Sequence, residues 1–368
     1  MKILFVASLH HPEALRAARE QFGAEILFPP SMSQHFWEKA LRKRGYTLDV
    51  FWRNNPGART QRHSAGITPA KVIGAIINRV PPQINPDARA RNAALIAHAR
   101  VFRPDLLWMV GDNTVIYPET LAAIQRETGC LLLYATGTSP IVFSRPIDRA
   151  AMRLYDLALV NDYYHGIQLL ELGAKRMECL PLSACDPDFH HAYPLTDAER
   201  AAYTCDISFV GTLLPDHLYS RRVKALEALR DFDLGIWSVH DVPPSLRKFV
   251  RGQALGEEMI KIISAAKLCL NTHGDFMLYG GNLRLFETAG AGICQLSDDL
   301  PGLRKWFPEI DGTPTIITYA DDDDLRAKTA YYLAHDDERQ AIGQAAQAHV
   351  YAEHTYDRRA ERLEQILR

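Results

Sequence analysis

The sequence predicts an α/β protein with two domains, each built on a parallel, doubly wound sheet. Three observations support this fold class. The chain has 368 residues, of which 47% are hydrophobic, and this is enough to fill two cores. Short apolar runs alternate with helical patterns in both halves. Glycine and polar residues follow several of these runs, where the carboxyl ends of parallel strands bind ligands.

The first half contains five apolar runs with the length of strands, and helical patterns lie between them. We expect strands at residues 3–6, 47–52, 104–110, 130–134 and 157–160. We expect helices at 33–44, 88–102, 118–128 and 148–155, and a further helix that follows the last strand and ends at Leu172. The stretch 54–86 is rich in proline and arginine and weakly periodic, so we expect a long excursion or a lid there.

The second half repeats the alternation. We expect strands at residues 206–210, 233–237, 268–271, 293–296 and 315–319, and helices at 222–229, 257–266, 322–333 and 336–367, the last interrupted near 354–356. Prolines break regular structure between residues 186 and 200, which places a domain boundary there. We therefore expect domains at 1–190 and 191–350, followed by a final helix at 351–368.

Composition narrows the classes of partner. The 42 basic and 44 acidic residues nearly balance, so nothing indicates a nucleic-acid or membrane partner. Six scattered cysteines without a CxxC pair fit reduced thiols better than disulfides or a zinc site. The sequence has no apolar run of transmembrane length and no signal peptide, so we expect a cytoplasmic protein without a transmembrane segment.

The segment from Tyr279 to Gly292 is the most informative feature of the chain. It lies between two apolar runs and is expected to form a Gly-rich loop (Gly280, Gly281), then a short helix that begins near Asn282. Such a loop and helix N-terminus present backbone N–H groups to phosphate. A carboxylate on this helix, Glu287, does not pair with phosphate, and its natural partner is a pair of ribose hydroxyls. The alternative is a carboxylate that only complements the helix dipole.

A second candidate is the turn that follows residues 206–210. Gly211 and Thr212 end this strand, and Arg221 and Arg222 come shortly after. Gly211 lets a phosphate approach the backbone, and a guanidinium group clamps a diphosphate with two hydrogen bonds. A plain turn with surface arginines is the alternative, and the sequence does not separate the two.

The first domain carries polar residues at its expected strand ends. His10, His11 and Asp112 are placed to hydrogen-bond a polyhydroxylated acceptor or to act on its proton. Structural roles are equally open, because Asp112 and Asn113 have the character of helix caps. Adjacent histidines rarely converge on one ion, so we expect no metal site here.

Two further polar runs are expected to be structural. The acidic run 321–324 is assigned to a helix start rather than to a divalent-ion site. His190 and His191 lie at the expected linker, and we expect both to be solvated.

With these residues in hand, the second half resembles the spore-maturation-type (CgeB-like) branch of the GT-B glycosyltransferases, of the group 1 type. The matching landmarks occur in order at residues 206–212 with Arg221, 267–271, 281–287, 321–333 and 354–359. The first domain matches only in style, at residues 103–105 and 118–120.

The resemblance implies two Rossmann-like domains that face each other across a cleft, with the closing helix packed back onto the first domain. It implies that the second domain holds a nucleoside diphosphate sugar, that Glu287 contacts the ribose, and that Gly211, Thr212 and Arg221 lie near the diphosphate. We add Asn271, Gly280, Gly281 and Asn282 to the nucleotide-binding set. Retaining enzymes of this fold often carry two glutamates separated by seven residues, the first of them near the sugar. This chain departs from that pattern, because Tyr279 stands at the first position.

The sequence thus predicts a metal-independent glycosyltransferase, with no cofactor beyond its donor, that acts on a glycan, lipid-linked or protein acceptor. Arg221 and Arg284 are the groups expected to stabilise the leaving diphosphate, and His10 and Asp112 are the acceptor-side catalytic candidates. We expect retention of anomeric configuration. The rivals are a nucleotide-sugar epimerase that uses His10, Asp112 and His273, and an inactive nucleotide-sugar-binding scaffold. An NAD enzyme is disfavoured because no GxGxxG follows the first strand.

Overall fold

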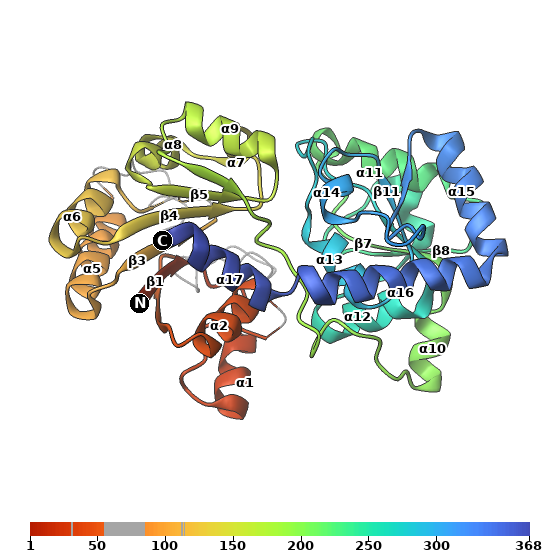
Figure 1. The fold of residues 1–368 in the computed structure, drawn as a ribbon, viewed down its shortest axis with the longest axis horizontal. Helices are drawn as coiled ribbons and strands as arrows, with labels where there is room; N and C mark the ends of the chain where they lie inside the picture. Colours follow the sequence, from red (N-terminus) through yellow and green to blue (C-terminus); the bar gives the residue numbers. More distant parts are fainter. Residues whose placement is uncertain (31, 55–84, 112, 114) are drawn as a thin grey trace, which may run out of the picture. The chain divides into compact units, whose positions relative to one another are not determined.

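A computed structural model describes residues 1–30, 32–54, 85–111, 113 and 115–368. The chain divides into two compact units (Figure 1). The first unit contains residues 1–30 and 38–180, and the second contains residues 31–37 and 181–368. In the described residues each unit is built on one sheet, so the two-domain α/β fold class is confirmed.

The first sheet has six strands in the order β2-β1-β3-β4-β5-β6, and every neighbouring pair is parallel. Its strands are β1 (Lys2–Ala7), β2 (Thr47–Trp52), β3 (Leu106–Val110), β4 (Leu131–Thr136), β5 (Leu157–Val160) and β6 (Met177–Cys179). The helices between them are α1 (Pro12–Phe22), α2 (Ser33–Lys43), α5 (Pro86–Phe102), α6 (Pro118–Thr128), α7 (Pro140–Phe143), α8 (Pro146–Ala151), the 3-10 turn η3 (Met152–Leu154) and α9 (Tyr163–Glu171).

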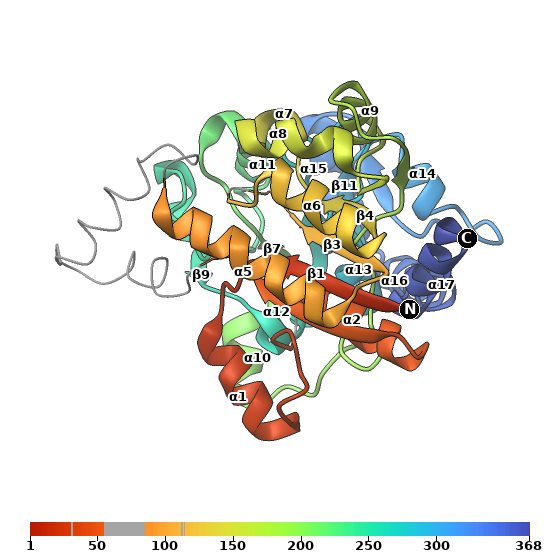
Figure 2. The same ribbon diagram turned by 90° about the vertical axis from the view of Figure 1, so that its left-hand side faces the viewer.

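The first core forms where helices cover this sheet. Helices α5 and α6 lie side by side in both views and bring Leu95 and Leu121 against Leu107 and Leu132 (Figure 2). All four side chains are fully buried. Residues 3–7 of β1 are also buried, because a parallel strand covered on both faces carries a continuous apolar run.

The second sheet also has six parallel strands, in the order β12-β11-β10-β7-β8-β9. Its strands are β7 (Cys205–Val210), β8 (Leu234–Trp237), β9 (Val250–Gly252), β10 (Ala266–Asn271), β11 (Gln295–Asp298) and β12 (Ile317–Tyr319). Its helices are α10 (Asp197–Tyr203), α11 (Asp216–Ala228), the 3-10 turn η4 (Pro244–Phe249), α12 (Gly256–Ala265), α13 (Leu283–Gly290), α14 (Leu303–Trp306), α15 (Asp322–Ala334), α16 (Asp336–Glu353) and α17 (Tyr356–Leu367).

Helices pack on both faces of the second sheet. Leu268 and Leu270 of β10 share one core with Leu226 of α11, whereas Cys269 shares another with Ile260 of α12. Successive residues of a strand point to opposite faces, which explains why one strand serves two cores. The strand order β10-β7 places the turns after both strands at the same edge, where ligands of such sheets bind.

Most predicted elements are confirmed. The strand at 157–160 and the helix at 118–128 match β5 and α6 residue for residue. The sequence reading did not include α1, α7, α10, α14, β6, β9 and η4, all of which are short except α1. The predicted lid at 54–86 lies almost wholly outside the described residues.

The stretch between residues 186 and 200 is more ordered than expected. Helix α10 begins there with a capping box, in which Thr196 Oγ1 accepts from the Glu199 N–H and the Glu199 carboxylate accepts from the Thr196 N–H. Cys185 forms a parallel bridge with Thr355, just before α17. The two compact units divide at Leu180, so the Cys185 bridge lies in the second unit. The domain boundary at residues 190 and 191 stays a prediction.

Helix α17 belongs to the second unit by its own contacts. The helical region that leads to it is interrupted at residues 354–355, as predicted, and the Thr355 side chain caps α17 by accepting from the Arg358 N–H at 3.2 Å. The packing of the closing helix on the first domain stays a prediction.

Candidate functional site

A cavity of about 220 Å³ lies where β7 and β10 end and α13 begins. It gathers small, amide and guanidinium side chains at the carboxyl edge of the second sheet. Its lining residues are Phe209, Val210, Gly211, Thr212, Arg222, Leu270, Asn271, Thr272, Asn282, Leu283 and Arg284. Five of the residues singled out from the sequence, Gly211, Thr212, Asn271, Asn282 and Arg284, thus meet at one cavity.

The start of α13 is fixed by two asparagines and two glycines. Asn282 caps the helix by accepting from the Leu285 N–H at 3.1 Å, and its Nδ2 donates to Asn271 Oδ1 at 2.8 Å. Gly280 and Gly281 have φ values of 106° and 96°, which side chains with a Cβ rarely adopt. The glycine pair does not line the cavity but turns the chain into the helix. Among the first N–H groups of α13, that of Leu285 is bonded to Asn282, and a helix N-terminus of this kind favours a nearby anion.

Arg222 is the basic group of α11 that lines the cavity. Its Nε donates to the Thr272 carbonyl at 2.8 Å and its Nη1 to the Thr212 carbonyl at 3.0 Å, so it ties the turns after β7 and β10 together. Burial lowers the pKa of Arg222 to about 10, and the guanidinium therefore remains protonated at neutral pH. From the sequence we named both Arg221 and Arg222, but we assigned the diphosphate to Arg221.

Arg221 has a different environment. Its guanidinium donates to the Asp275 and Asp298 carboxylates, both at 3.2 Å, and to the carbonyls of Gly274 and Met277 at 2.7 and 2.6 Å. All three of its nitrogens therefore bond the protein itself. Arg221 fixes the loop after β10 and is not among the residues that line the cavity.

Glu287 lies one helical turn after Arg284 and is only 4% exposed. Its Oε2 accepts from Arg284 Nη1, and burial would raise the pKa of Glu287 if Arg284 and His190 did not lower it below the ordinary value. Glu287 is therefore a buried carboxylate behind the arginine that lines the cavity. Its Oε1 lies 3.8 Å from His190 Nε2.

The expectation that His190 is solvated is wrong. His190 is 1% exposed, because residues 185–190 are part of the second unit. Its Nε2 lies 3.8 Å from Glu287 Oε1. Gly290 allows this approach, since a Cβ there would lie 2.9 Å from the His190 carbonyl oxygen and Cβ. The sequence signal for this residue was the adjacent Phe189, whose apolar ring favours a buried segment.

His273, a candidate acid-base group of the rival epimerase, is fully buried. Its Nδ1 and its backbone N–H both lie within hydrogen-bonding distance of Asp298 Oδ1, at 2.8 and 3.0 Å. Burial would raise the pKa of Asp298, but His273 and Arg221 lower it. This pair holds the start of the loop after β10.

The acceptor-side candidates lie in the first unit. His10 is exposed, three residues after β1 ends, whereas Asp112 lies outside the described residues. The side chain of the neighbouring Asn113 closes a turn, with its Oδ1 accepting from the Ile116 N–H at 2.8 Å and its Nδ2 donating to the Ile116 carbonyl at 2.7 Å.

The acidic run 321–324 begins a helix, as predicted, because Asp321 caps α15 by accepting from the Asp324 N–H at 2.9 Å. Among the residues that the structure describes, no group of three or more His, Cys, Asp or Glu side chains converges as metal ligands would.

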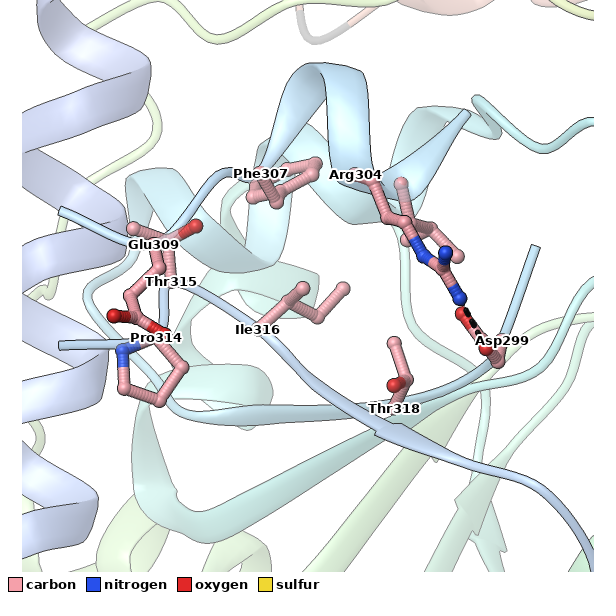
Figure 3. A pocket seen from close by; sticks show the side chains of 9 residues that line it. Asp299, Arg304, Phe307, Glu309, Pro314, Thr315, Ile316 and Thr318 are labelled. Carbon is pink, nitrogen blue, oxygen red and sulfur yellow. Dashed lines mark hydrogen bonds and ion pairs between the residues drawn. The ribbon is translucent and has the colours of Figure 1, made fainter. Parts of the chain in front are cut away.

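A second hollow of about 200 Å³ lies beside β12 (Figure 3). It is lined by Asp299, Leu303, Arg304, Phe307, Glu309, Pro314, Thr315, Ile316 and Thr318. Figure 3 shows Arg304 extending to Asp299, with which it forms an ion pair at 3.2 Å. Its one arginine is therefore already paired, and none of the residues singled out from the sequence lines this hollow.

Seven of the eleven residues that line the cavity at α13 lie in the part of the chain that matches a known family. Residues 215–365 match the model of the glycosyl transferase-like family. That region includes Arg222, Asn271, Asn282, Arg284 and Glu287. A comparison with curated proteins gives no significant match.

Solved structures resemble the whole chain. One is HepE of Anabaena in complex with UDP and glucose, with 12% identity, a TM-score of 0.60, and coverage of 100% of this chain and 99% of that one. A glycosyltransferase of Rickettsia africae gives 11% identity, a TM-score of 0.62, and coverage of 99% and 97%. A UDP-N-acetylglucosamine 2-epimerase described as putative, of Listeria monocytogenes, gives 12%, 0.51, and 100% and 95%. These likenesses confirm the GT-B type of fold with its two Rossmann-like sheets.

No helix among the described residues is both long enough and apolar enough to cross a bilayer.

Proposed function

We propose that the chain is a glycosyltransferase that transfers a sugar from a nucleoside diphosphate donor to an acceptor hydroxyl. One observation carries the proposal: two guanidinium groups, two asparagine amides and the start of α13 line one cavity at the carboxyl ends of β7 and β10. The match of residues 215–365 to the glycosyl transferase-like family supports it.

The lining of the cavity suits a diphosphate. Arg222 and Arg284 supply positive charge, and the lack of a side chain at Gly211 lets the Phe209 ring lie against the turn, where a Cβ would come within 3.0 Å of it. Ligand pockets commonly have volumes of about 300–1,000 Å³, so a cavity of about 220 Å³ matches part of a nucleotide sugar rather than all of it. We assign it to the diphosphate portion.

Departure of the nucleoside diphosphate places additional negative charge on its terminal phosphate in the transition state. Arg222, Arg284 and the first N–H groups of α13 are preorganised to stabilise that charge, so no metal ion is required in this mechanism. Arg222 takes the place that the sequence assigned to Arg221, since the guanidinium of Arg221 is bonded to the loop after β10.

Glu287 is assigned to the ribose. Its Oε2 is held by Arg284, and its Oε1 is the carboxylate oxygen that we assign to the ribose hydroxyls. Because HepE was solved with UDP and glucose, UDP-glucose is the first donor to test. Retention of configuration, the CgeB-like branch, a cytoplasmic location and a glycan, lipid-linked or protein acceptor are further parts of the proposal.

The test is to incubate the protein with UDP-sugars and a panel of hydroxyl acceptors and to follow products by NMR. Transfer with release of UDP, and an unchanged anomeric configuration, is the expected result. A donor sugar converted while still attached to UDP would instead identify an epimerase, and binding without turnover would identify a scaffold. An inverted product would remove only the retaining mechanism.

A further inference from the structure

His190 is a buried histidine to which the proposed mechanism assigns no role. Its ring is enclosed by aromatic side chains, with the rings of Phe36 and Phe189 both centred 5.1 Å from it. The backbone carbonyl of His190 accepts from the Tyr351 hydroxyl at 2.9 Å. Ring packing therefore holds the side chain of His190, and a hydrogen bond holds its backbone.

The hydrogen bonds of the ring decide which nitrogen carries the proton. The Asp186 N–H donates to His190 Nδ1 at 2.8 Å, so Nδ1 is an acceptor. The carbonyl of Asp186 lies farther from Nδ1, at 3.3 Å. In the neutral ring the proton then resides on Nε2, which faces Glu287.

The gap between His190 and Glu287 has an unbonded donor on the histidine side. His190 Nε2 is a buried atom with no hydrogen bond among the described residues, and Glu287 Oε1 is 3.8 Å away. Buried N–H groups in folded proteins are nearly always bonded. A small rotation of the Glu287 carboxylate brings Oε1 within hydrogen-bonding distance.

We propose that His190 is a positioning residue for ribose recognition: its Nε2–H orients Glu287 Oε1 toward the ribose hydroxyls of the bound nucleotide. Arg284 holds the other carboxylate oxygen, so the two contacts together fix the plane of the carboxylate. This inference rests on the proposed function, because it concerns how the same site recognises a ribonucleotide.

Two substitutions separate the two ring nitrogens. The amide of His190→Gln reaches the position of Nε2 and keeps a donor toward Glu287. The amide of His190→Asn reaches only the position of Nδ1 and keeps an acceptor for the Asp186 N–H. The measurement is the ratio of the dissociation constants of 2′-deoxy-UDP and UDP, by calorimetry, for the wild type, both variants and Glu287→Ala.

Because each ratio is taken on one protein, partial unfolding of a variant does not change it. The wild type should prefer UDP by about tenfold, as one charged hydrogen bond predicts. We expect His190→Gln to keep this preference within about twofold, and His190→Asn to lose most of it, as Glu287→Ala does.

Each outcome has a separate meaning. A wild type that binds none of UDP, GDP and dTDP overturns the proposed function, and the inference with it. A wild type that prefers UDP together with a His190→Asn variant that keeps the full preference overturns the inference alone. Equal loss in both histidine variants also overturns it, because the effect then does not depend on the Nε2 donor.

Discussion

The carboxyl edges of the two sheets both carry an arginine that bonds the surrounding turns, and they differ in what lies beside it. At the first sheet, Arg53 donates to Ser8 Oγ at 3.1 Å and to the Gly111 carbonyl at 3.3 Å, while Thr136 Oγ1 accepts from the Thr138 N–H at 3.1 Å. At the second sheet, Arg222 and Arg284 line a cavity. Similar strand-turn-helix sequences thus place an arginine among the turns of the first sheet and two arginines at a cavity in the second.

The difference shows that polar residues at strand ends do not by themselves identify a ligand site. What marks the second edge is a pair of guanidinium groups at a cavity next to a helix N-terminus. Arg222 also donates to two backbone carbonyls there, and Arg284 to the Glu287 carboxylate. The predictions below test this contrast, from the largest expected effect to the smallest.

Arg222→Met should weaken UDP binding most. It removes a cavity-lining guanidinium and keeps much of the side-chain volume, so we expect about a 100-fold higher dissociation constant, equal to about 2.7 kcal/mol. Calorimetry measures the change. The matched control is Arg230→Met, an exposed arginine just beyond α11, which should leave the affinity unchanged.

Arg221→Met should act on stability. It leaves Asp298, whose side chain is 12% exposed, without one of its cationic partners, and it frees the loop at Gly274 and Met277. We expect a loss of about 2 kcal/mol in the free energy of unfolding in urea. If Arg221→Met were instead fully stable and weakened UDP binding more than Arg222→Met, the assignment of the two arginines would be reversed.

The stability of the second unit should fall in mild acid because of His354. Burial lowers the pKa of His354 to about 3, and Arg359 donates to its Nδ1 at 3.0 Å. The unfolded chain binds a proton below about pH 6.5 and the folded chain does not, so stability is present above pH 6.5 and is lost as the pH falls.

From pH 7 to pH 5 this loss amounts to about 2 kcal/mol. Urea unfolding at the two pH values measures this loss of stability. Amide exchange, corrected for its intrinsic pH dependence, then compares β10 of the second unit with β3 of the first. The His354→Asn variant should lose much less stability over the same interval. An equal decline in the variant would show that another group is responsible.

His10→Ala tests the first unit. We expect unchanged UDP affinity and about tenfold slower transfer, as the loss of one hydrogen bond to an acceptor predicts. Initial rates at saturating donor, together with calorimetry, give both quantities. Weaker UDP binding in this variant would contradict the assignment of His10 to the acceptor side.

The sequence was sufficient for the fold and for most of the cavity. Apolar runs of strand length predicted ten of the twelve described strands, all but the short edge strands β6 and β9, and the glycine pair before Asn282 predicted the start of α13. Each of these signals is local, because periodicity, caps and turn residues act within a few residues of each other.

Contacts between distant segments were not predictable. The choice between Arg221 and Arg222 depends on the direction of adjacent side chains on α11, which also contains a kink at Tyr219. His190 approaches Glu287 because residues 185–190 are part of the second unit, although they lie far from Glu287 in the sequence. No local pattern in the sequence records either arrangement.

Amide hydrogen exchange with and without saturating UDP tests the central claim most directly, because it compares the two sheet edges in one experiment. The account predicts slower exchange in peptides that contain Gly211–Thr212 and Leu283–Arg284, and no change in those that contain Ser8–His11 and Thr136–Ser139. Slower exchange confined to the peptides of the first sheet would contradict it.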